Sequence, residues 1–361
     1  MTTRIPALAV LSAVLFSLTG CAADAETPAA AQVFAMDTVM DLTAYGASGE
    51  KAVSQAEEEL YRLEAELSRT REDSEVTALN EAGTAHVGAD VAALLKAALT
   101  YSQATGDAFD ITVAPVVSAW GFTTDHYQVP SQETLDALLG VVDDAQIQVA
   151  EDADGAQVTL GAGQSVDLGG IAKGYAADRV AQIFVQEGVE HGMISLGGNV
   201  YVRGTKPDGS PWRVGVQNPA QTDENDMPVG ILTLTDCFAV TSGGYQRYFE
   251  QDGVRYHHII DPATGFPADS GLQSVTVVAP AGDETAGAGA GTMCDAFSTA
   301  LFVMGEEKAL DFWRTSGYDF DLVLVTDDGR VVVTDGLKDR FYTVSDAQDA
   351  EGSGYTYETV S

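Results

Sequence analysis

The chain has 361 residues, of which 45% are hydrophobic, and its 54 acidic and 18 basic side chains give a formal net charge of −36. That length and hydrophobic content are enough to bury one large core or two packed subdomains, so global disorder is not expected. The basic footprint of a nucleic-acid-binding protein is missing from the sequence. An anionic substrate would need local positive charge from a metal, a lysine or helix N-termini.

The first residues have the pattern of a bacterial lipoprotein signal. Residues 1–4 carry one positive charge, and the apolar run 5–18 has signal-peptide length and is too short to span a bilayer. The sequence then reads Leu-Thr-Gly-Cys, which resembles a lipobox, so we expect Cys21 to be lipidated and to become the mature N-terminus. The alternative is a cleaved signal peptide followed by a chance cysteine.

Composition divides the rest of the chain. After a signal peptide at 1–20, residues 21–32 form a small-residue tether, and 33–344 form the folded part. Residues 345–361 are polar and acidic, which predicts a flexible tail. The stretch 286–291 alternates alanine and glycine and predicts a flexible loop.

Periodicity in the folded part predicts both helices and strands. Apolar residues at helical spacing predict helices over 52–67, from an N-cap at Asp90 to about 106, over 171–186, and from Asp295 to 305. Short β-branched runs predict strands over 33–44, 193–196, 212–216, 230–235, 275–278, 322–326 and 331–334. An Asp-Asp-Gly turn at 327–329 joins the last two strands as a hairpin. The elements do not alternate as a βαβ repeat, so we predict a mixed α/β (α+β) fold and not a Rossmann fold.

Two cysteines fall in the folded part, Cys237 and Cys294, with no CxxC motif and no histidine at metal-ligand spacing. We expect two buried free thiols, because a buried cysteine behaves as a small hydrophobe. A disulfide is the alternative.

Paired glycines precede the third predicted helix. Residues 166–175 read Val-Asp-Leu-Gly-Gly-Ile-Ala-Lys-Gly-Tyr. Glycines let backbone amides approach a ligand closely, the helix N-terminus favours an anion, and Lys173 adds a positive charge one turn in. The segment can therefore cradle a pyrophosphate. A tight turn with a solvated lysine explains the same residues equally well.

Asp295 and Thr299 are four residues apart and would share one face of a helix. A carboxylate and a hydroxyl, with nearby carbonyls, form a hard-oxygen site that suits Mg²⁺. Taken alone, these two residues are more simply explained by helix capping and by a hydroxyl bonded to the preceding turn.

Two more segments carry candidate side chains. In 256–265, His258 can act as a base near neutral pH, with Asp261 to orient it, and the histidine spacing does not suit zinc. In 106–115, Asp110 can accept a hydrogen bond from a ring N–H. Ordinary loop hydrogen bonding and a helix C-cap are the structural alternatives.

The order of these segments resembles the FAD:protein FMN transferase family, the ApbE-type flavin transferases. The matching signatures extend across roughly residues 33 to 343 and lie at 34–38, 73–75 with 79–80, 109–113, 167–175, 196–199, 241–243, 258–265 and 295–299. The resemblance implies one α/β catalytic unit similar to the tunnelling-fold-related flavin transferases.

Carried over by position, the resemblance implies that FAD contacts Met36, Ala108, Phe109, Asp110, Asp167, Lys173 and His258. It implies Mg²⁺ ligands at the Gly170 carbonyl, Asp295, Thr299 and the Ser298 carbonyl. His258, Asp295 and Lys173 would be the catalytic residues. Two positions depart from the family pattern. Thr70 stands where many relatives carry an aromatic residue that packs on the flavin nucleotide, and Asp37 replaces the usual glycine between methionine and threonine.

The implied activity is Mg²⁺-dependent transfer of FMN from FAD to a Thr or Ser hydroxyl of a target protein, with release of AMP. The implied partner is an extracytoplasmic flavoprotein of membrane electron transport, and the enzyme would be lipid-anchored at the extracytoplasmic face of the bacterial cytoplasmic membrane. Two alternatives use the same site: a pyrophosphatase that splits FAD into FMN and AMP, and a lipoprotein that binds flavin without catalysis.

Overall fold

The structure is a computed structural model, and it describes residues 27–124, 126–220, 227–282, 288–343 and 354–361. The predicted signal peptide, the lipidation candidate Cys21 and part of the tether lie outside the described residues. Within the described ranges, every helix is too short or too polar to cross a membrane.

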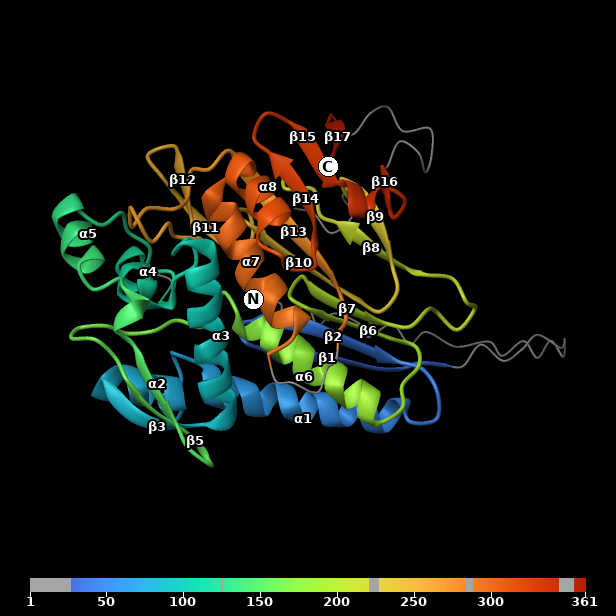
Figure 1. Cartoon of the computed structure of the whole chain (residues 1–361), viewed down its shortest axis with the longest axis horizontal. Coiled ribbons are helices and arrows are strands. Elements are labelled where there is room, and N and C mark those ends of the chain that lie inside the picture. Colours follow the sequence, from blue (N-terminus) through green and yellow to red (C-terminus); the bar gives the residue numbers. More distant parts are fainter. Residues whose placement is uncertain (1–26, 125, 221–226, 283–287, 344–353) are drawn as a thin grey trace, which may run out of the picture.

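A nine-stranded sheet forms the centre of the molecule (Figure 1), in the order β1-β2-β6-β7-β10-β13-β14-β15-β17. Neighbouring strands are antiparallel, except for the last pair, β15 and β17, which is parallel. The strands are β1 Ala29–Ala35, β2 Thr38–Ala44, β6 Gly192–Leu196, β7 Asn199–Arg203, β10 Cys237–Gly243, β13 Leu272–Pro280, β14 Asp321–Thr326, β15 Arg330–Thr334 and β17 Thr356–Val360.

Helices cover one face of this sheet and bury their apolar sides in a shared core. In α1, for example, Leu60, Leu63 and Leu67 recur at helical spacing and are all buried. Figure 1 shows α6 and α7 side by side against the sheet. The helices are α1 Gly49–Leu67, α2 Glu75–Ala82, α3 Ala89–Thr105, α6 Ala172–Gln186, α7 Ala290–Met304 and α8 Glu306–Thr315.

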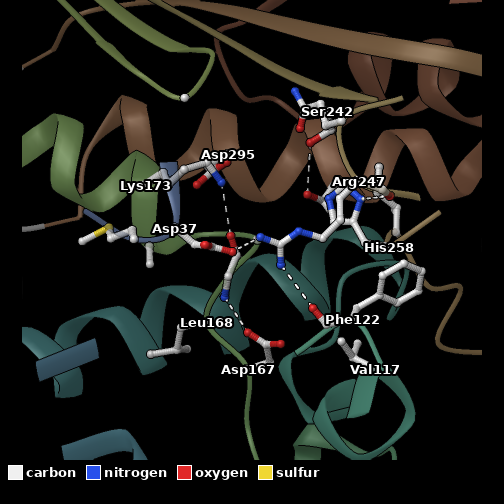
Figure 2. Close-up of a pocket in the computed structure, with 18 of the residues that line it drawn as sticks. Asp37, Val117, Phe122, Asp167, Leu168, Lys173, Ser242, Arg247, His258 and Asp295 are labelled. Atoms are coloured by element: carbon white, nitrogen blue, oxygen red, sulfur yellow. Dashed lines mark hydrogen bonds and ion pairs between the residues drawn. The ribbon is translucent and has the colours of Figure 1, made fainter. Parts of the chain in front are cut away.

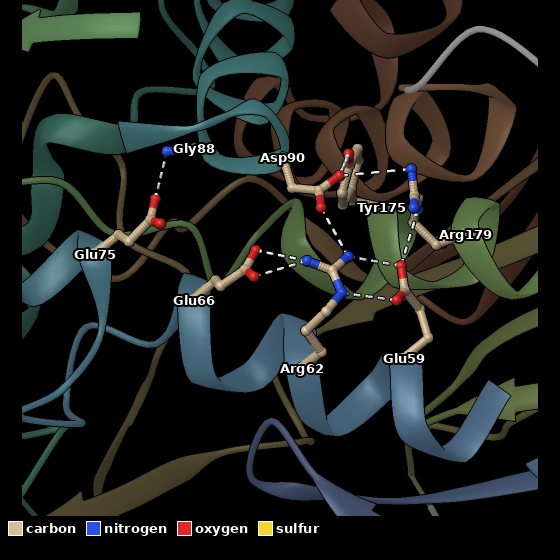
Figure 3. Close-up of polar contacts among 8 residues, drawn as sticks. All are labelled: Glu59, Arg62, Glu66, Glu75, Gly88, Asp90, Tyr175 and Arg179. Carbon is tan, nitrogen blue, oxygen red and sulfur yellow. Dashed lines mark hydrogen bonds and ion pairs between the residues drawn. The ribbon is translucent and has the colours of Figure 1, made fainter. Parts of the chain in front are cut away.

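A polar network ties three of these helices together (Figure 3). Arg62 of α1 binds Glu59 at 2.7 Å and reaches Asp90 of α3, also at 2.7 Å. From α6, the Tyr175 hydroxyl donates to Asp90 at 2.5 Å and Arg179 pairs with Glu59 at 3.0 Å. Asp90 is therefore a tether between helices and not the predicted N-cap of α3, a position that Gly88 occupies.

A small sheet packs on the opposite face of the central sheet. Its order is β16-β9-β8, and Trp212, Leu232 and Leu234 form a second core with valines of the central strands. The strands are β8 Trp212–Val216, β9 Gly230–Leu234 and β16 Phe341–Thr343.

The remaining elements are short. A third apolar cluster joins Trp120, Phe122, Leu135 and Ile260. The elements are β3 Thr84–Gly88, β4 Gln148–Glu151, β5 Gly155–Thr159, α4 Ala114–Trp120, α5 Gln132–Leu139, β11 Tyr248–Gln251, β12 Val254–His257 and the 3-10 turns η1 Ile111–Val113, η2 Asp144–Gln146 and η3 Asp335–Leu337.

The mixed α/β class is confirmed, as are the amphipathic helices, the β14–β15 hairpin and the two buried free thiols. The single strand predicted over 33–44 is wrong. The chain turns at Met36 and Asp37, whose φ angles of 49° and 61° are left-handed, and β1 pairs with β2 as a hairpin. The sequence hides this turn because it lacks the Asn-Gly signal typical of two-residue hairpins.

Two further boundaries differ. Helix α7 begins at Ala290, so Ala290 and Gly291 of the predicted flexible loop are helical, and Asp295 lies in the second turn instead of at the cap. In the predicted flexible tail, residues 356–360 form β17 on β15. The alternation of Tyr357 with polar residues is too short a signal to separate an edge strand from a tail.

Candidate active site

A cavity of about 980 Å³ opens where segments distant in sequence converge (Figure 2). The β1–β2 turn, the glycine segment before α6, helix α7, the end of β10 and the segment after β12 all contribute to its wall. Among the predicted site residues, those that line it are Met36, Ala108, Phe109, Asp110, Asp167, Gly170, Lys173, His258, Asp295 and Thr299. The predicted flavin contacts and the predicted metal ligands therefore share one cavity, except for Ser298, which does not line it.

Helices α6 and α7 meet backbone to backbone beside this cavity. The amide of Gly174 donates to Oδ2 of Asp295 at 2.8 Å. A Cβ on Gly174 would lie 2.3 Å from the Gly291 carbonyl oxygen, so only glycine permits this approach. On the cavity side, Gly170 faces Thr299: a Cβ there would be 3.5 Å from Thr299 Oγ1.

One buried side chain fixes the start of α7 against α6. Asp178, one turn beyond Gly174, accepts hydrogen bonds from the amides of Gly289, Gly291 and Thr292, each at 2.8 Å, and from the Thr292 hydroxyl. Complete burial raises the pKa of Asp178 to about 6, and these donors oppose the rise. The carboxylate caps a helix from another helix, which orients the turn that carries Asp295.

The oxygen atoms near Asp295 form a connected group. Asp295 is only 3% exposed although it lines the cavity. Ser242 Oγ lies 2.8 Å from Ser298 Oγ and 3.3 Å from Thr299 Oγ1, and Ser298 Oγ donates to the Asp295 carbonyl at 2.9 Å. The Ser298 side chain is fully buried behind the cavity wall. Ser242, which sequence reasoning left without a role, joins β10 to this group.

These oxygens suit a hard cation. In the described part of the chain, no group of three or more His, Cys, Asp or Glu side chains is arranged to hold a metal. A metal at Asp295 would therefore rely on one carboxylate plus the Thr299 hydroxyl and the Gly170 carbonyl. Mg²⁺ accepts such a set when substrate phosphates and waters complete its shell.

The glycine segment is held from both sides. Asn80 of α2 brackets Val166, accepting from its amide at 2.7 Å and donating to its carbonyl at 2.9 Å. Asp167 accepts from the Gly169 amide at 2.8 Å and from Arg69 at 2.6 Å. Lys173 Nζ contacts the Gly169 carbonyl at 3.4 Å. In the described residues Lys173 has no carboxylate within ion-pair distance, so its charge can serve a ligand.

His258 takes its orientation from a backbone carbonyl. Its Nδ1 lies 3.1 Å from the carbonyl oxygen of Arg247, and since a carbonyl only accepts, Nδ1 carries the proton and Nε2 is the acceptor. Burial lowers the pKa of His258 to about 3, so the ring is neutral at physiological pH. The expectation that Asp261 orients it is wrong. The Asp261 carboxylate accepts from the Ala263 amide and the Thr264 hydroxyl of its own turn.

Asp110 is engaged in a local turn at the cavity wall. Its Oδ1 accepts from both the amide and the hydroxyl of Thr112, each at 2.6 Å, and so begins η1. Burial raises its pKa. A hydrogen bond from a ring N–H of a ligand would therefore use Oδ2 of Asp110, the oxygen that does not accept from Thr112.

Several cavity residues escaped sequence reasoning. Glu64 accepts from the amide of Met36 at 2.7 Å and supports the left-handed turn. Arg69 and Arg247 line the cavity, and Arg247 pairs with Asp37 (Figure 2). Both arginines stand beside signature segments, but nothing in the local pattern separates them from surface arginines. Thr70, at the expected aromatic position, also lines the cavity.

The fold and this cavity define a flavin-transferase type of protein. The chain belongs to the ApbE family, whose model matches residues 36–323. The FAD:protein FMN transferase of Treponema pallidum is 36% identical over an alignment of 296 residues, and the match covers 78% of this chain and 78% of that one. The enzyme of the same name from Haemophilus influenzae is 32% identical over 292 residues, 79% of this chain and 82% of that one.

Two solved structures are similar to this one over most of the chain. The ApbE protein of Thermotoga maritima matches with a TM-score of 0.77 and 32% identity, covering 86% of this chain and 98% of that one. The flavin transferase ApbE from Vibrio cholerae matches with a TM-score of 0.73 and 27% identity, covering 87% and 99%.

Proposed function

We propose that this protein is an FAD:protein FMN transferase that uses Mg²⁺ and joins FMN to a Thr or Ser hydroxyl of a target protein. The observation that carries the proposal is the convergence in one cavity of Lys173, His258 and the oxygens around Asp295. The names of the similar enzymes supply the donor and the transferred group.

The glycine segment and Lys173 bind the pyrophosphate of FAD. Backbone amides at the start of α6 point toward an anion, and Lys173 supplies a full positive charge. In a chain with a net charge of −36, this local charge offsets the general repulsion of a phosphate ligand.

Asp295, Thr299 and the carbonyls of Gly170 and Ser298 would hold Mg²⁺. When bound, Mg²⁺ neutralises charge on the phosphate oxygens. The Gly174 amide and Asp178 keep the Asp295 carboxylate at the cavity wall.

His258 receives the proton of the attacking hydroxyl. The hydroxyl oxygen bonds to the phosphorus on the riboflavin side while the bond from that phosphorus to the bridging oxygen breaks. AMP leaves with the bridging oxygen, and FMN remains as a phosphoester on the target. A neutral imidazole with a free Nε2 is the form that can accept the proton.

The decisive experiment incubates the purified protein with FAD, Mg²⁺ and a candidate extracytoplasmic flavoprotein, and measures both AMP release and the mass of the acceptor. We expect equal amounts of AMP and FMN-labelled acceptor, and loss of both with EDTA or with Asp295→Ala. AMP with free FMN in the absence of acceptor would identify a pyrophosphatase. Binding of FAD without AMP under any condition would leave only a flavin carrier and refute the transferase.

We also propose that Cys21 is lipidated and anchors the enzyme at the extracytoplasmic face of the cytoplasmic membrane, near a flavoprotein of membrane electron transport. The lipobox-like sequence after a short apolar run supports this. In cells, Cys21→Ser should move the protein from the membrane fraction to the soluble fraction. Membrane retention of the Ser variant would refute lipidation at this cysteine.

A further inference from the structure

Asp37 and Arg247 form an ion pair inside the cavity (Figure 2). Asp37 comes from the β1–β2 turn, and Arg247 from the segment between β10 and β11. In Figure 2 the arginine extends from the side of His258 and Phe122 to the side of Lys173 and Asp295, where it meets Asp37. Both residues line the cavity, so the pair occupies space that a ligand would use.

The arginine is the better fixed partner. Its guanidinium donates to the Phe122 carbonyl at 3.3 Å, and its own carbonyl accepts from both the amide and Nδ1 of His258, each at 3.1 Å. Arg247 is thus tied to the residue that we propose as the base. A substitution of Arg247 is therefore made next to the proposed base, His258.

Asp37 sits in a turn that holds its carboxylate over the cavity. Met36 and Asp37 both have left-handed φ angles, which are uncommon for residues other than glycine. The Asp37 side chain is 70% exposed and that of Arg247 is 41% exposed, and such an exposed ion pair contributes little to stability. A stronger anion can displace the carboxylate at small cost.

We propose that Arg247 is a phosphate-binding residue and that Asp37 is its internal competitor. The inference rests on the proposed function, because the ligand is the pyrophosphate of FAD. A guanidinium matches phosphate oxygens with paired hydrogen bonds, and a doubly charged pyrophosphate competes better than one exposed carboxylate. Riboflavin, which has no phosphate, cannot take Asp37's place. Arg247 therefore favours phosphate-bearing flavins over riboflavin, and Asp37 lowers this preference by occupying the guanidinium.

The test compares the affinities of FAD and riboflavin by equilibrium dialysis in Mg²⁺ buffer, with AMP measured in the same samples. Arg247→Ala should weaken FAD binding by about tenfold and leave the affinity for riboflavin unchanged. Asp37→Asn should strengthen FAD by up to about fivefold, again without effect on riboflavin. In the Arg247→Ala background, Asp37→Asn should add nothing, because the carboxylate acts only through the guanidinium.

Matched controls separate this effect from loss of charge or fold. Asp41→Asn removes an exposed carboxylate of the neighbouring strand β2, and Arg255→Ala removes an exposed arginine of β12; neither residue lines the cavity, and neither change should alter FAD affinity. Wild-type FAD affinity in Arg247→Ala, or weaker FAD binding in Asp37→Asn, overturns the inference. If Arg247→Ala fails to fold, the Asp37→Asn and Asp41→Asn pair still decides. A wild type that binds FAD but releases no AMP after an acceptor protein is added refutes only the transferase.

Discussion

The amide of Gly174 and the carboxylate of Asp295 lie 2.8 Å apart although 121 residues separate them in the chain. This single hydrogen bond joins the start of α6, the proposed phosphate-binding segment, to the proposed metal ligand at the same wall. It uses one oxygen of the carboxylate and aims the side chain, so the spacing between the two functional segments is set by the packing of α6 on α7.

Gly174→Ala should therefore disable the site. The added methyl group would meet the Gly291 carbonyl at 2.3 Å and Asp295 Cβ at 2.6 Å, and α7 would have to move. We expect roughly a 100-fold loss of AMP release, the scale of a 1 Å misplacement of catalytic groups. Gly282→Ala, where a Cβ meets nothing within 4 Å, is the control. Equal activity in both variants would show that the helix contact does not govern the chemistry.

Asp178→Asn should weaken Mg²⁺ binding although Asp178 does not line the cavity. An amide cannot accept all the hydrogen bonds that this carboxylate receives from the start of α7, so Asp295 and Thr299 lose their fixed position. We expect the Mg²⁺ concentration for half-maximal activity to rise about tenfold, as for other residues that orient metal ligands.

Asp90→Asn is the matched control for that variant. Asp90 also ties α6 to its neighbours, through Tyr175 and Arg179, but it does not line the cavity (Figure 3). It should lower the melting temperature while the Mg²⁺ titration stays unchanged. If Asp90→Asn also shifted the Mg²⁺ titration, the effect of Asp178→Asn would be explained by a general loss of stability.

His258 predicts an unusual pH profile. Because its pKa is lowered to about 3, the ring stays neutral as the pH falls from about 8 to about 6, and activity should be flat over that range instead of declining near the ordinary histidine pKa. His258→Gln should reduce AMP release by about 100-fold or more. His257→Gln, at a neighbour that does not line the cavity, should not. A decline centred near pH 6.5 would contradict the lowered pKa of His258.

Asp144 makes stability depend on pH. Burial and the charges of Asp110, Asp107 and Asp143 raise the pKa of Asp144 to about 6, and its buried Oδ2 has no hydrogen-bond partner among the described residues. Above pH 6 the folded state must hold a disfavoured charge, whereas well below the ordinary pKa of 3.8 the group is protonated in both the folded and the unfolded state and this cost vanishes.

Asp144→Asn should therefore raise the melting temperature above that of the wild type, and this gain should be larger at pH 8 than at pH 5. We expect the gain at pH 8 to exceed the gain at pH 5 by about 2–4 °C. The exposed Asp154→Asn should show no such pH-dependent gain. A difference between Asp144→Asn and the wild type that is constant with pH would contradict the raised pKa.

Elements with strong periodicity, and residues that belong to motifs, could be predicted from the sequence. The helices around Leu60 and Val180 and the β14–β15 hairpin follow from local patterns. The meeting of Gly170 with Thr299 was an expectation from family resemblance, and no local pattern contains it, because it depends on how α6 packs on α7.

What the sequence could not provide were contacts between segments distant in the chain. Asp178 reads as one more polar residue of a helix, yet it caps a different helix. Arg247 reads as a strand-flanking arginine, yet it meets a carboxylate 210 residues away. Asp261 looked like a partner for His258, but the turn that it belongs to supplies nearer donors.

The pairing of β17 with β15 bears on how this protein is produced. The final strand covers the edge of the central sheet, and Arg314 also binds the carbonyl of Ser361 at 2.8 Å. A gene shortened at residue 343 to remove a seemingly dispensable acidic end would uncover a valine-rich edge, and such edges recruit other chains into aggregates. Purification tags are better appended beyond Ser361 than substituted for these residues.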